Sequence, residues 1–410
     1  MIATRLAGAA ALFAIVLLGA SPAEAQAYVP GVTCPAGQAV TGDTPQSGIV
    51  CASLGSVFAN RLINPTMEID QVHEGSSVAL VSGTPAYVVD GVKIGFVSTG
   101  HTTNATLSCQ RVADAPQGYT YSLQCTVGTA ASAVGSGDYI VALIPIEADN
   151  IQDALLGTAG AQTLCVQWQS KISIGSYVAG WAFQNFAQTR SYPNAVPAST
   201  AATWTANQAC FTGDTSGTWV TSGNNGGAYL VLTFAAGGTF QNTGATWAAG
   251  DYFAASSQSN SLLTTAGSTF EITNVKFEMA PASSPFRRRP IQQELALCQR
   301  YYEKSYDLGV LPGTAAARTG QEFFGFWGTT NATYSFGIRF KVPKRAAAAV
   351  TVYSPTTGAS GNVDNNTTAD VAAAAAQIGL EGFQVGTTAA FTPAAIGGGL
   401  RVHWTADARL

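Results

Sequence analysis

The feature that most constrains the fold is a long series of short apolar segments that runs from residue 60 to about residue 286. Segments such as Tyr139–Ile144 and Tyr229–Phe234 have the length of single strands, and clusters of Gly, Asn, Ser, Thr and Asp separate them. Regularly spaced short strands with such turns are typical of β-sandwiches and jelly rolls. No repeat of fixed period is present, which disfavours solenoids and propellers. Similar strand-like segments resume after Phe323, so a second β-domain is expected there.

A helix is predicted between these two β-regions, over Pro290–Ser305. Proline fits the first turn of a helix without cost. Leu295, Cys298, Tyr301 and Tyr302 then follow at spacings that place them along one side of a helix. Two other segments are less regular: Asp149–Leu156 is compatible with a short helix, and the Ala-rich Thr367–Ala376 with a short helix or a loop.

The predicted fold class is therefore mainly β: two β-sandwich, jelly-roll-like domains joined by a short α-helix and preceded by an N-terminal hydrophobic leader. We expect a signal-like segment at 1–25, a small Cys-stapled segment at 26–58, a jelly-roll domain at 59–287, a connector helix at 288–306 and a C-terminal β-sandwich domain at 307–410.

The leader has the three parts of a secretory signal peptide. A short positive start ending at Arg5 precedes an uncharged apolar run over residues 6–19, and an A-x-A cleavage pattern ends at Ala25. The run is shorter than the roughly 20 residues that a permanent membrane anchor needs. Cleavage and export are the favoured interpretation, and a retained hydrophobic segment that anchors the chain or packs in an oligomer is the alternative.

The seven cysteines indicate disulfides rather than a metal site. No C-x-x-C motif occurs, and six of the seven fall into neighbouring pairs along the chain: Cys34/Cys51, Cys109/Cys125 and Cys165/Cys210. Together with an export signal, this favours disulfides in an oxidising compartment, although the pairing cannot be deduced and buried free thiols remain the alternative. Cys298 is left over, and its place in the predicted helix suggests a reduced core residue.

Composition excludes several functional classes. Only 10% of residues are charged and the net charge is −4, so a nucleic-acid partner is not expected despite the Arg287–Arg289 run. With three histidines and no metal-binding motif, we expect no metal and no cofactor. Neither a G-x-S-x-G motif nor a phosphate-binding loop is present. The closest approach to catalytic chemistry is the acidic cluster of Glu68, Asp70 and Glu74, which would be a weak candidate for glycoside hydrolysis.

Aromatic side chains offer a better candidate for binding. Aromatic rings stack on the apolar faces of sugars, although most tryptophans in β-sandwiches belong to the core. Trp168 lies in an apolar segment and is expected in the core. Trp219 and Trp247 lie beside Gly- and Thr-rich turns and are therefore our candidates for glycan contact.

Several local sequences are similar to a domain of tailed-bacteriophage tail fibres and related virion proteins. The similarity covers roughly residues 59–410, and its most specific motif is Glu294–Lys304 (ELALCQRYYEK). The other matching stretches are Asn60–Gln71, Arg190–Pro193, Gly213–Trp219, Phe270–Glu278, Pro285–Arg287, Val350–Pro355 and His403–Leu410. In one departure, the family's usual Asp-Arg-Trp after the second strand is replaced here by Gly91-Val92-Lys93, which follows Asp90.

This resemblance implies that the jelly-roll domain at 59–287 is similar to a carbohydrate-binding module. It also implies a non-enzymatic protein of the virion surface: a tail, head or collar fibre, or a decoration, that presents β-sandwiches and contacts a host-surface glycan. By analogy with fibres it implies a homo-oligomer, with a trimer favoured, and other virion proteins as partners. A secreted bacterial or prophage-encoded lectin or adhesin is the alternative, which the leader favours. A glycan depolymerase is a third hypothesis, which would rest on Glu68 and Asp70.

Overall fold

The computed structural model describes residues 38–44, 48–53, 60–325, 330–365, 369–392 and 398–410. The chain divides into two compact units, Met1–Ser56 and Val57–Leu410. In the first unit, β1 (Gln38–Thr44) and β2 (Gly48–Ser53) pair as an antiparallel hairpin. The expected leader at 1–25 and the pairing of Cys34 with Cys51 lie outside the described residues. No helix in the described part of the chain is long and apolar enough to cross a membrane.

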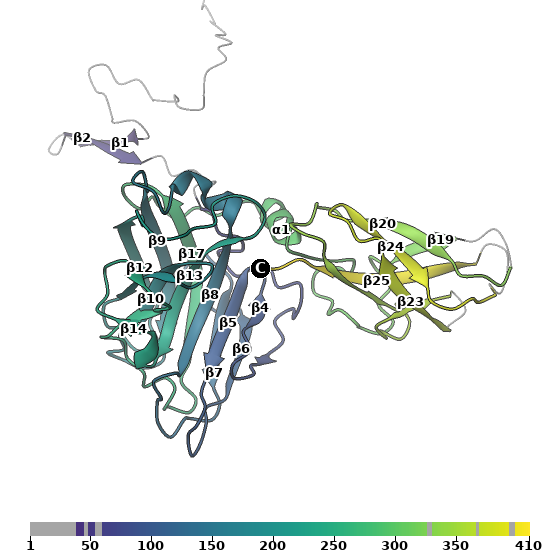
Figure 1. Ribbon diagram of the computed structural model, residues 1–410, viewed down its shortest axis with the longest axis horizontal. Coiled ribbons are helices and arrows are strands. Elements are labelled where there is room, and N and C mark those ends of the chain that lie inside the picture. Colours follow the sequence, from purple (N-terminus) through teal and green to yellow (C-terminus); the bar gives the residue numbers. More distant parts are fainter. Residues whose placement is uncertain (1–37, 45–47, 54–59, 326–329, 366–368, 393–397) are drawn as a thin grey trace, which may run out of the picture. The chain divides into compact units, whose positions relative to one another are not determined.

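The larger unit begins with a sandwich of two sheets that face each other (Figure 1). The first sheet has seven strands in the order β15 (Ala248–Ala249), β11 (Arg190–Ala195), β10 (Gly180–Asn185), β13 (Gly226–Ala236), β8 (Tyr139–Glu147), β5 (Val92–Val97) and β4 (Ala86–Val89). The second has six strands in the order β12 (Thr205–Thr212), β9 (Thr163–Ile172), β17 (Thr269–Met279), β7 (Ser122–Val127), β6 (Leu107–Val112) and β3 (Val78–Ala79). The expected jelly-roll-like architecture is thus confirmed for this region.

The sandwich core fills the space between the sheets, and one sheet is also covered on its outer face. Ile140 and Leu230 point into the main core, whereas their neighbours Val141 and Tyr229 belong to a second apolar cluster on the other side of the same sheet. Segment 237–255 contributes Phe240 and Phe253 to that cluster. Within this segment lie η2 (Gly238–Phe240) and a short parallel pair, β14 (Gln241–Asn242) with β16 (Ala254–Ala255). Burial on both faces explains why β8 and β13 are apolar at nearly every position rather than at alternate ones.

Two of the three suggested cysteine pairs form disulfides between neighbouring strands of the six-stranded sheet. Cys109 on β6 lies opposite Cys125 on β7, with Cα atoms 4.0 Å apart. Cys165 on β9 lies opposite Cys210 on β12, at 4.1 Å. Cys298 is a buried free thiol, as expected, and burial raises its pKa well above the usual value.

The segment after β8 forms η1 (Ala148–Ala154), a 3₁₀ helix that overlaps most of the short helix expected at Asp149–Leu156. The connector helix is shorter than predicted. α1 spans Ile291–Gln299, and the prediction that helix continues to about residue 305 is wrong, because Tyr302–Lys304 form strand β18. This strand pairs with Thr405–Asp407 of β25 (Gly399–Asp407). Tertiary pairing and burial of Glu303 and Lys304 against charged partners therefore override the helical periodicity.

The C-terminal β-domain is organised around β25. Besides β18, this strand pairs with β19 (Glu322–Gly325), β21 (Ala349–Tyr353) and β22 (Asn362–Asp364). The sheet continues through β23 (Asp370–Ala376) and β24 (Gly382–Thr387) to β20 (Ser335–Arg339). Within the Ala-rich segment, Asp370–Ala376 is thus a strand rather than a helix or loop. Trp404, Phe383 and Val363 lie in the separate core of this domain.

Buried polar contacts link the two domains within this unit. Asp90 accepts hydrogen bonds from the backbone and side-chain nitrogens of Gln71, at 2.8 and 2.9 Å. The Gln71 amide also donates to the Tyr302 carbonyl, at 2.8 Å. Glu147 holds the end of α1 through paired hydrogen bonds from Arg300. The helix and the sandwich are therefore held by specific directional contacts.

Candidate functional site

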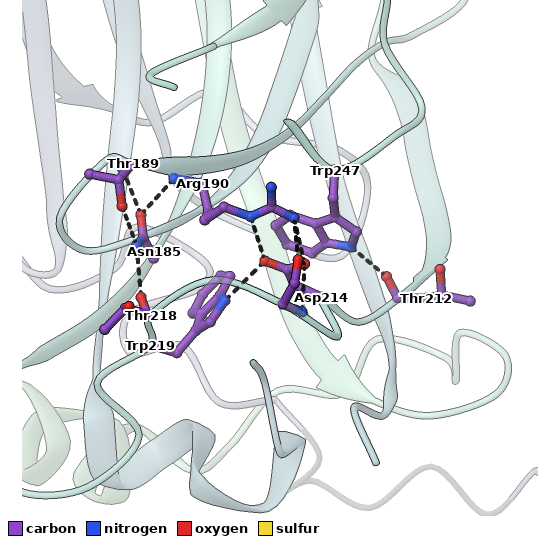
Figure 2. Close-up of polar contacts among 9 residues, drawn as sticks. Asn185, Thr189, Arg190, Thr212, Asp214, Thr218, Trp219 and Trp247 are labelled. Atoms are coloured by element: carbon purple, nitrogen blue, oxygen red, sulfur yellow. Dashed lines mark hydrogen bonds and ion pairs between the residues drawn. The ribbon is translucent and has the colours of Figure 1, made fainter. Parts of the chain in front are cut away.

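The two predicted tryptophans lie next to each other in the sandwich domain (Figure 2). Trp219 lies in the loop between β12 and β13, and Trp247 directly precedes edge strand β15. Their ring centroids are 5.6 Å apart and the rings are perpendicular, at 89°. Both side chains are partly buried and pack against the sandwich core, and Trp219 stacks on Phe183. The pair is thus part of the aromatic packing at the border of the sandwich core.

A rigid polar network holds this tryptophan pair. The Trp219 indole N–H donates to Asp214, at 3.1 Å, and the Trp247 N–H donates to the Thr212 carbonyl, at 2.8 Å. Arg190 donates two hydrogen bonds to the same carboxylate, at 2.8 and 2.7 Å (Figure 2). Burial alone would raise the Asp214 pKa, but the Arg190 and Trp219 hydrogen bonds outweigh it and hold that pKa below its usual value.

The glycine-rich turn before Trp219 makes this packing possible. Gly217 has a φ of +82°, a conformation that glycine adopts easily, and a Cβ added there would lie 2.7 Å from Cγ of Arg190. Both indole N–H groups are used within the protein, so a ligand could meet only the exposed parts of the rings. Glycan contact by Trp219 and Trp247 stays a prediction.

A second aromatic site, which the sequence analysis missed, lies on the outer face of the seven-stranded sheet. It is a pocket of about 190 Å³ between β5, β8 and β13 and the covering segment 237–255. Its polar and aromatic lining consists of Lys93, Tyr139, Gln188, Tyr229, Phe240, Asp251 and Phe253. We call it the aromatic pocket.

Strand register positions the rings of the aromatic pocket. Tyr139 lies opposite Val97 on β5, and a Cβ added at Gly95 would lie 3.3 Å from the Tyr139 ring, so glycine leaves room for the ring to cross this strand. Phe240 meets Tyr139 edge-to-face, with ring centroids 5.1 Å apart. Tyr229 stacks on Phe186 at 4.5 Å, so its ring has little freedom to move.

Two charged groups face the pocket without forming ion pairs among the described residues. The Lys93 ammonium lies 5.9 Å from the centre of the Tyr229 ring, and burial lowers its pKa. Asp251 accepts a hydrogen bond from Gln184 at 2.9 Å, and burial raises its pKa. Burial also raises the pKa of Tyr229 to about 12, so its hydroxyl keeps its proton. A pocket with rigid apolar walls and a few convergent polar groups has the general character of a small-ligand site.

The acidic cluster is occupied by structural partners. Asp70 is 1% exposed and accepts hydrogen bonds from the backbone of His73 and Gly75, which closes a turn. Glu68 pairs with Arg288, and Glu74 pairs with Lys304. Among the described residues, no three His, Cys, Asp or Glu side chains converge in a way that could hold a metal ion.

Sequence comparisons find no matching protein family and no matching curated protein. Among solved structures, the enzymatically active domain of tailspike protein 4 from bacteriophage CBA120 is similar over 55% of this chain and 22% of that one, with 10% identity and a TM-score of 0.29. The α-L-arabinofuranosidase MgGH51 aligns over 55% and 27%, with 12% identity and a TM-score of 0.30. This chain therefore spans about a quarter of the length of either protein.

A smaller protein aligns over nearly its whole length. The family 11 carbohydrate-binding module of Lic26A-Cel5E from Clostridium thermocellum covers 50% of this chain and 96% of its own, with 10% identity and a TM-score of 0.25.

Proposed function

We propose that this chain is a carbohydrate-binding protein whose sandwich domain holds one sugar ring in the aromatic pocket. The observation that supports this most strongly is the convergence of Tyr139, Tyr229 and Phe240 with Lys93 and Asp251 in a single pocket. Aromatic walls suit the C–H faces of a pyranose ring. The ammonium and the carboxylate supply a donor and an acceptor for its hydroxyl groups.

The volume of the aromatic pocket limits the size of the ligand that it can hold. Its volume of about 190 Å³ is below the roughly 300–1,000 Å³ of typical pockets for drug-sized ligands. A single ring, such as the end of a glycan chain, fits this volume better than an oligosaccharide bound along its length. We therefore expect recognition of a terminal sugar residue.

For the biological setting, we propose a non-enzymatic fibre or decoration on the surface of a tailed-bacteriophage virion that contacts a host-surface glycan. This part rests on the sequence resemblance over residues 59–410. It includes the expected homotrimer and the expected contacts with other virion proteins.

A secreted lectin or adhesin, of bacterial or prophage origin, is the second candidate. The disulfides Cys109–Cys125 and Cys165–Cys210 favour it, because such bonds persist in oxidising, extracellular settings. Both candidates share the extracellular location. The intact mass of the native protein distinguishes them: loss of residues 1–25 would indicate export through a signal peptide, whereas a full-length chain would favour assembly in the cytoplasm.

Binding can be tested on a glycan array with the full chain and three variants. Asp251→Asn and Lys93→Met should each lose most of the signal of any glycan that the unmodified chain binds. Asp153→Asn, which changes an exposed carboxylate outside the aromatic pocket, should retain it. Full binding by both pocket variants, or no glycan bound by the unmodified chain, would refute the proposal. Trp219→Ala and Trp247→Ala on the same array test the tryptophan pair separately.

A further inference from the structure

The aromatic pocket contains a partly buried ammonium group without a bound counter-charge. Lys93 lies on the outer face of β5, because its neighbour Ile94 points into the main core. Its Nζ lies 5.1 Å from the centre of the Tyr87 ring and 5.9 Å from that of Tyr229. Among the described residues, it has neither a hydrogen-bond acceptor nor an ion pair. Buried charges in proteins are normally paired, so a ligand is a natural source of the missing partner.

The charges around Lys93 add to the cost of leaving it unpaired. Burial, Arg409 and Arg345 all disfavour the ammonium and lower its pKa. Asp407 acts in the opposite direction, but Arg409 already binds both of its carboxylate oxygens. Arg345 donates to three backbone carbonyl groups, and among the described residues it pairs with no carboxylate. This end of the pocket therefore favours an anion.

The carboxylate of the same pocket lies at its other end. Asp251 accepts a hydrogen bond from Gln184 of β10, whereas Lys93 extends from β5. Two strands, β13 and β8, lie between β10 and β5 in the sheet. Neighbouring strands are about 4.8 Å apart, so the backbones of β10 and β5 are separated by about 14 Å. Lys93 and Asp251 thus reach the pocket from opposite sides, and a ligand between them meets a cation on one side and an acceptor on the other.

We propose that the ring bound in the aromatic pocket is a uronic acid, whose carboxylate pairs with Lys93 and whose hydroxyl groups donate to Asp251. This inference rests on the proposed sugar site and names the class of sugar. In a uronic acid, the carboxylate that C5 carries lies across the ring from the hydroxyl on C2, so one ring can meet both sides of the pocket. An uncharged sugar would leave Lys93 unpaired, and an ion pair with a carboxylate is stronger than a hydrogen bond between neutral groups.

The volume of the pocket favours a carboxylate over larger anions. A uronic acid carries its charge on the ring's own sixth carbon and so remains a single ring with short substituents. A phosphate or sulfate ester adds a tetrahedral group beyond that carbon, which is more than a pocket of about 190 Å³ suits.

The test compares charged sugars with neutral analogues of the same shape. The probes are the methyl glycosides of glucuronate and galacturonate and the corresponding amides, in which a neutral amide replaces the carboxylate; glucose 6-phosphate is the larger anion. Binding to the full chain at pH 7 is measured by saturation-transfer NMR and calorimetric titration. Lys93→Met and Lys93→Gln both remove the charge. Lys341→Met, at an exposed lysine outside the aromatic pocket, is the matched control.

We expect the full chain to bind at least one of the two uronates about tenfold more tightly than its amide, as a hydrogen bond to a charged group implies. Lys93→Met and Lys93→Gln should remove this preference, and Lys341→Met should keep it. Glucose 6-phosphate should bind more weakly than the preferred uronate. Circular dichroism of the variants checks that the fold is kept.

Equal binding of each uronate and its amide would overturn the inference and leave the proposed sugar site standing. The same holds if the uronates do not bind while a neutral glycan on the array does. A preference that survives in both Lys93 variants would place the recognition of charge elsewhere and overturn the inference, as would tighter binding of glucose 6-phosphate. If none of the probes and no glycan on the array binds, the inference and the proposed function fail together.

Discussion

His403 should make the stability of the C-terminal domain depend on pH. The imidazole is fully buried between β-strands and stacks on Tyr306, with ring centres 3.8 Å apart. Its Nε2 lies 3.0 Å from the Ala317 carbonyl and its Nδ1 lies 2.9 Å from the Ser305 hydroxyl. A carbonyl can only accept, so Nε2 carries the proton. The Ser305 hydroxyl oxygen already accepts a hydrogen bond from the backbone N–H of Trp404, so the Ser305 hydroxyl donates its own proton to an unprotonated Nδ1 of His403.

The magnitude follows from the pKa. Burial lowers the pKa of His403 from 6.5 to about 4. The unfolded chain therefore binds this proton at a higher pH than the folded chain does, and stability is lost as the pH falls from about 6.5 towards 4. The shift in pKa corresponds to a loss of about 3.4 kcal/mol in the free energy of unfolding well below pH 4, and about 2 kcal/mol of this is already lost at pH 5.

The assay is urea unfolding at pH 8 and pH 5, followed by tryptophan fluorescence, for the unmodified chain and for His403→Gln. Glutamine cannot titrate but can still donate to the Ala317 carbonyl. We expect the unmodified chain to lose about 2 kcal/mol more than the variant between the two pH values. Equal losses would refute the reasoning. NMR titration of the His403 ring gives an independent check if the variant folds poorly, since a midpoint near 6.5 would also contradict it.

Three further predictions concern single sites. Burial raises the pKa of Asp90 from 3.8 to about 6, so this carboxyl stabilises the folded chain as the pH falls, the opposite of His403. Relative to Asp90→Asn, the free energy of unfolding of the unmodified chain in urea should rise by about 1.4 kcal/mol from pH 8 to pH 5. An equal change in both proteins would contradict the burial argument. Lys344→Met should lower the free energy of unfolding by about 3–5 kcal/mol, because it leaves Glu303 charged in a fully buried site. Adding Glu303→Gln should restore part of this loss. An unchanged free energy of unfolding in Lys344→Met would exclude the ion pair. The double variant Cys165→Ala and Cys210→Ala should lower the free energy of unfolding by about 4 kcal/mol, because the disulfide no longer closes a loop of 45 residues in the unfolded chain. An unchanged midpoint of unfolding in guanidinium would show that the disulfide is not formed in solution.

Strand content and core position could be predicted from the sequence because they depend on local pattern. The segments Tyr139–Ile144 and Tyr229–Phe234 are central strands, and Trp168 lies in the core as expected. Both segments are apolar at nearly every position, and this pattern indicates a sheet that is covered on both faces. The sequence therefore also held a signal for the second apolar cluster, beside which the aromatic pocket lies.

Features that depend on distant partners could not be predicted in this way. Tyr302–Lys304 continue a helical pattern, but pairing with β25 makes them a strand. The alanines of β23 favour a helix, yet the strand is held between β22 and β24, with Ala373 in the core. The aromatic pocket brings Lys93 together with Asp251 only because β5, β8 and β13 are neighbours in the sheet. No short-range pattern encodes that adjacency.

The position of the last strand in each domain sets the order in which the chain can fold during synthesis. β17 is the final strand of the sandwich, yet it lies inside its sheet, between β7 and β9. β25 is the final strand of its domain and pairs with four others. Until these segments leave the ribosome, β7 and β9 have open edges, and β18, β19 and β21 lack the strand that joins them. Each nascent domain must therefore wait with unpaired strand edges, a state prone to aggregation, and completion of its last strand is the step that commits it to the native sheet.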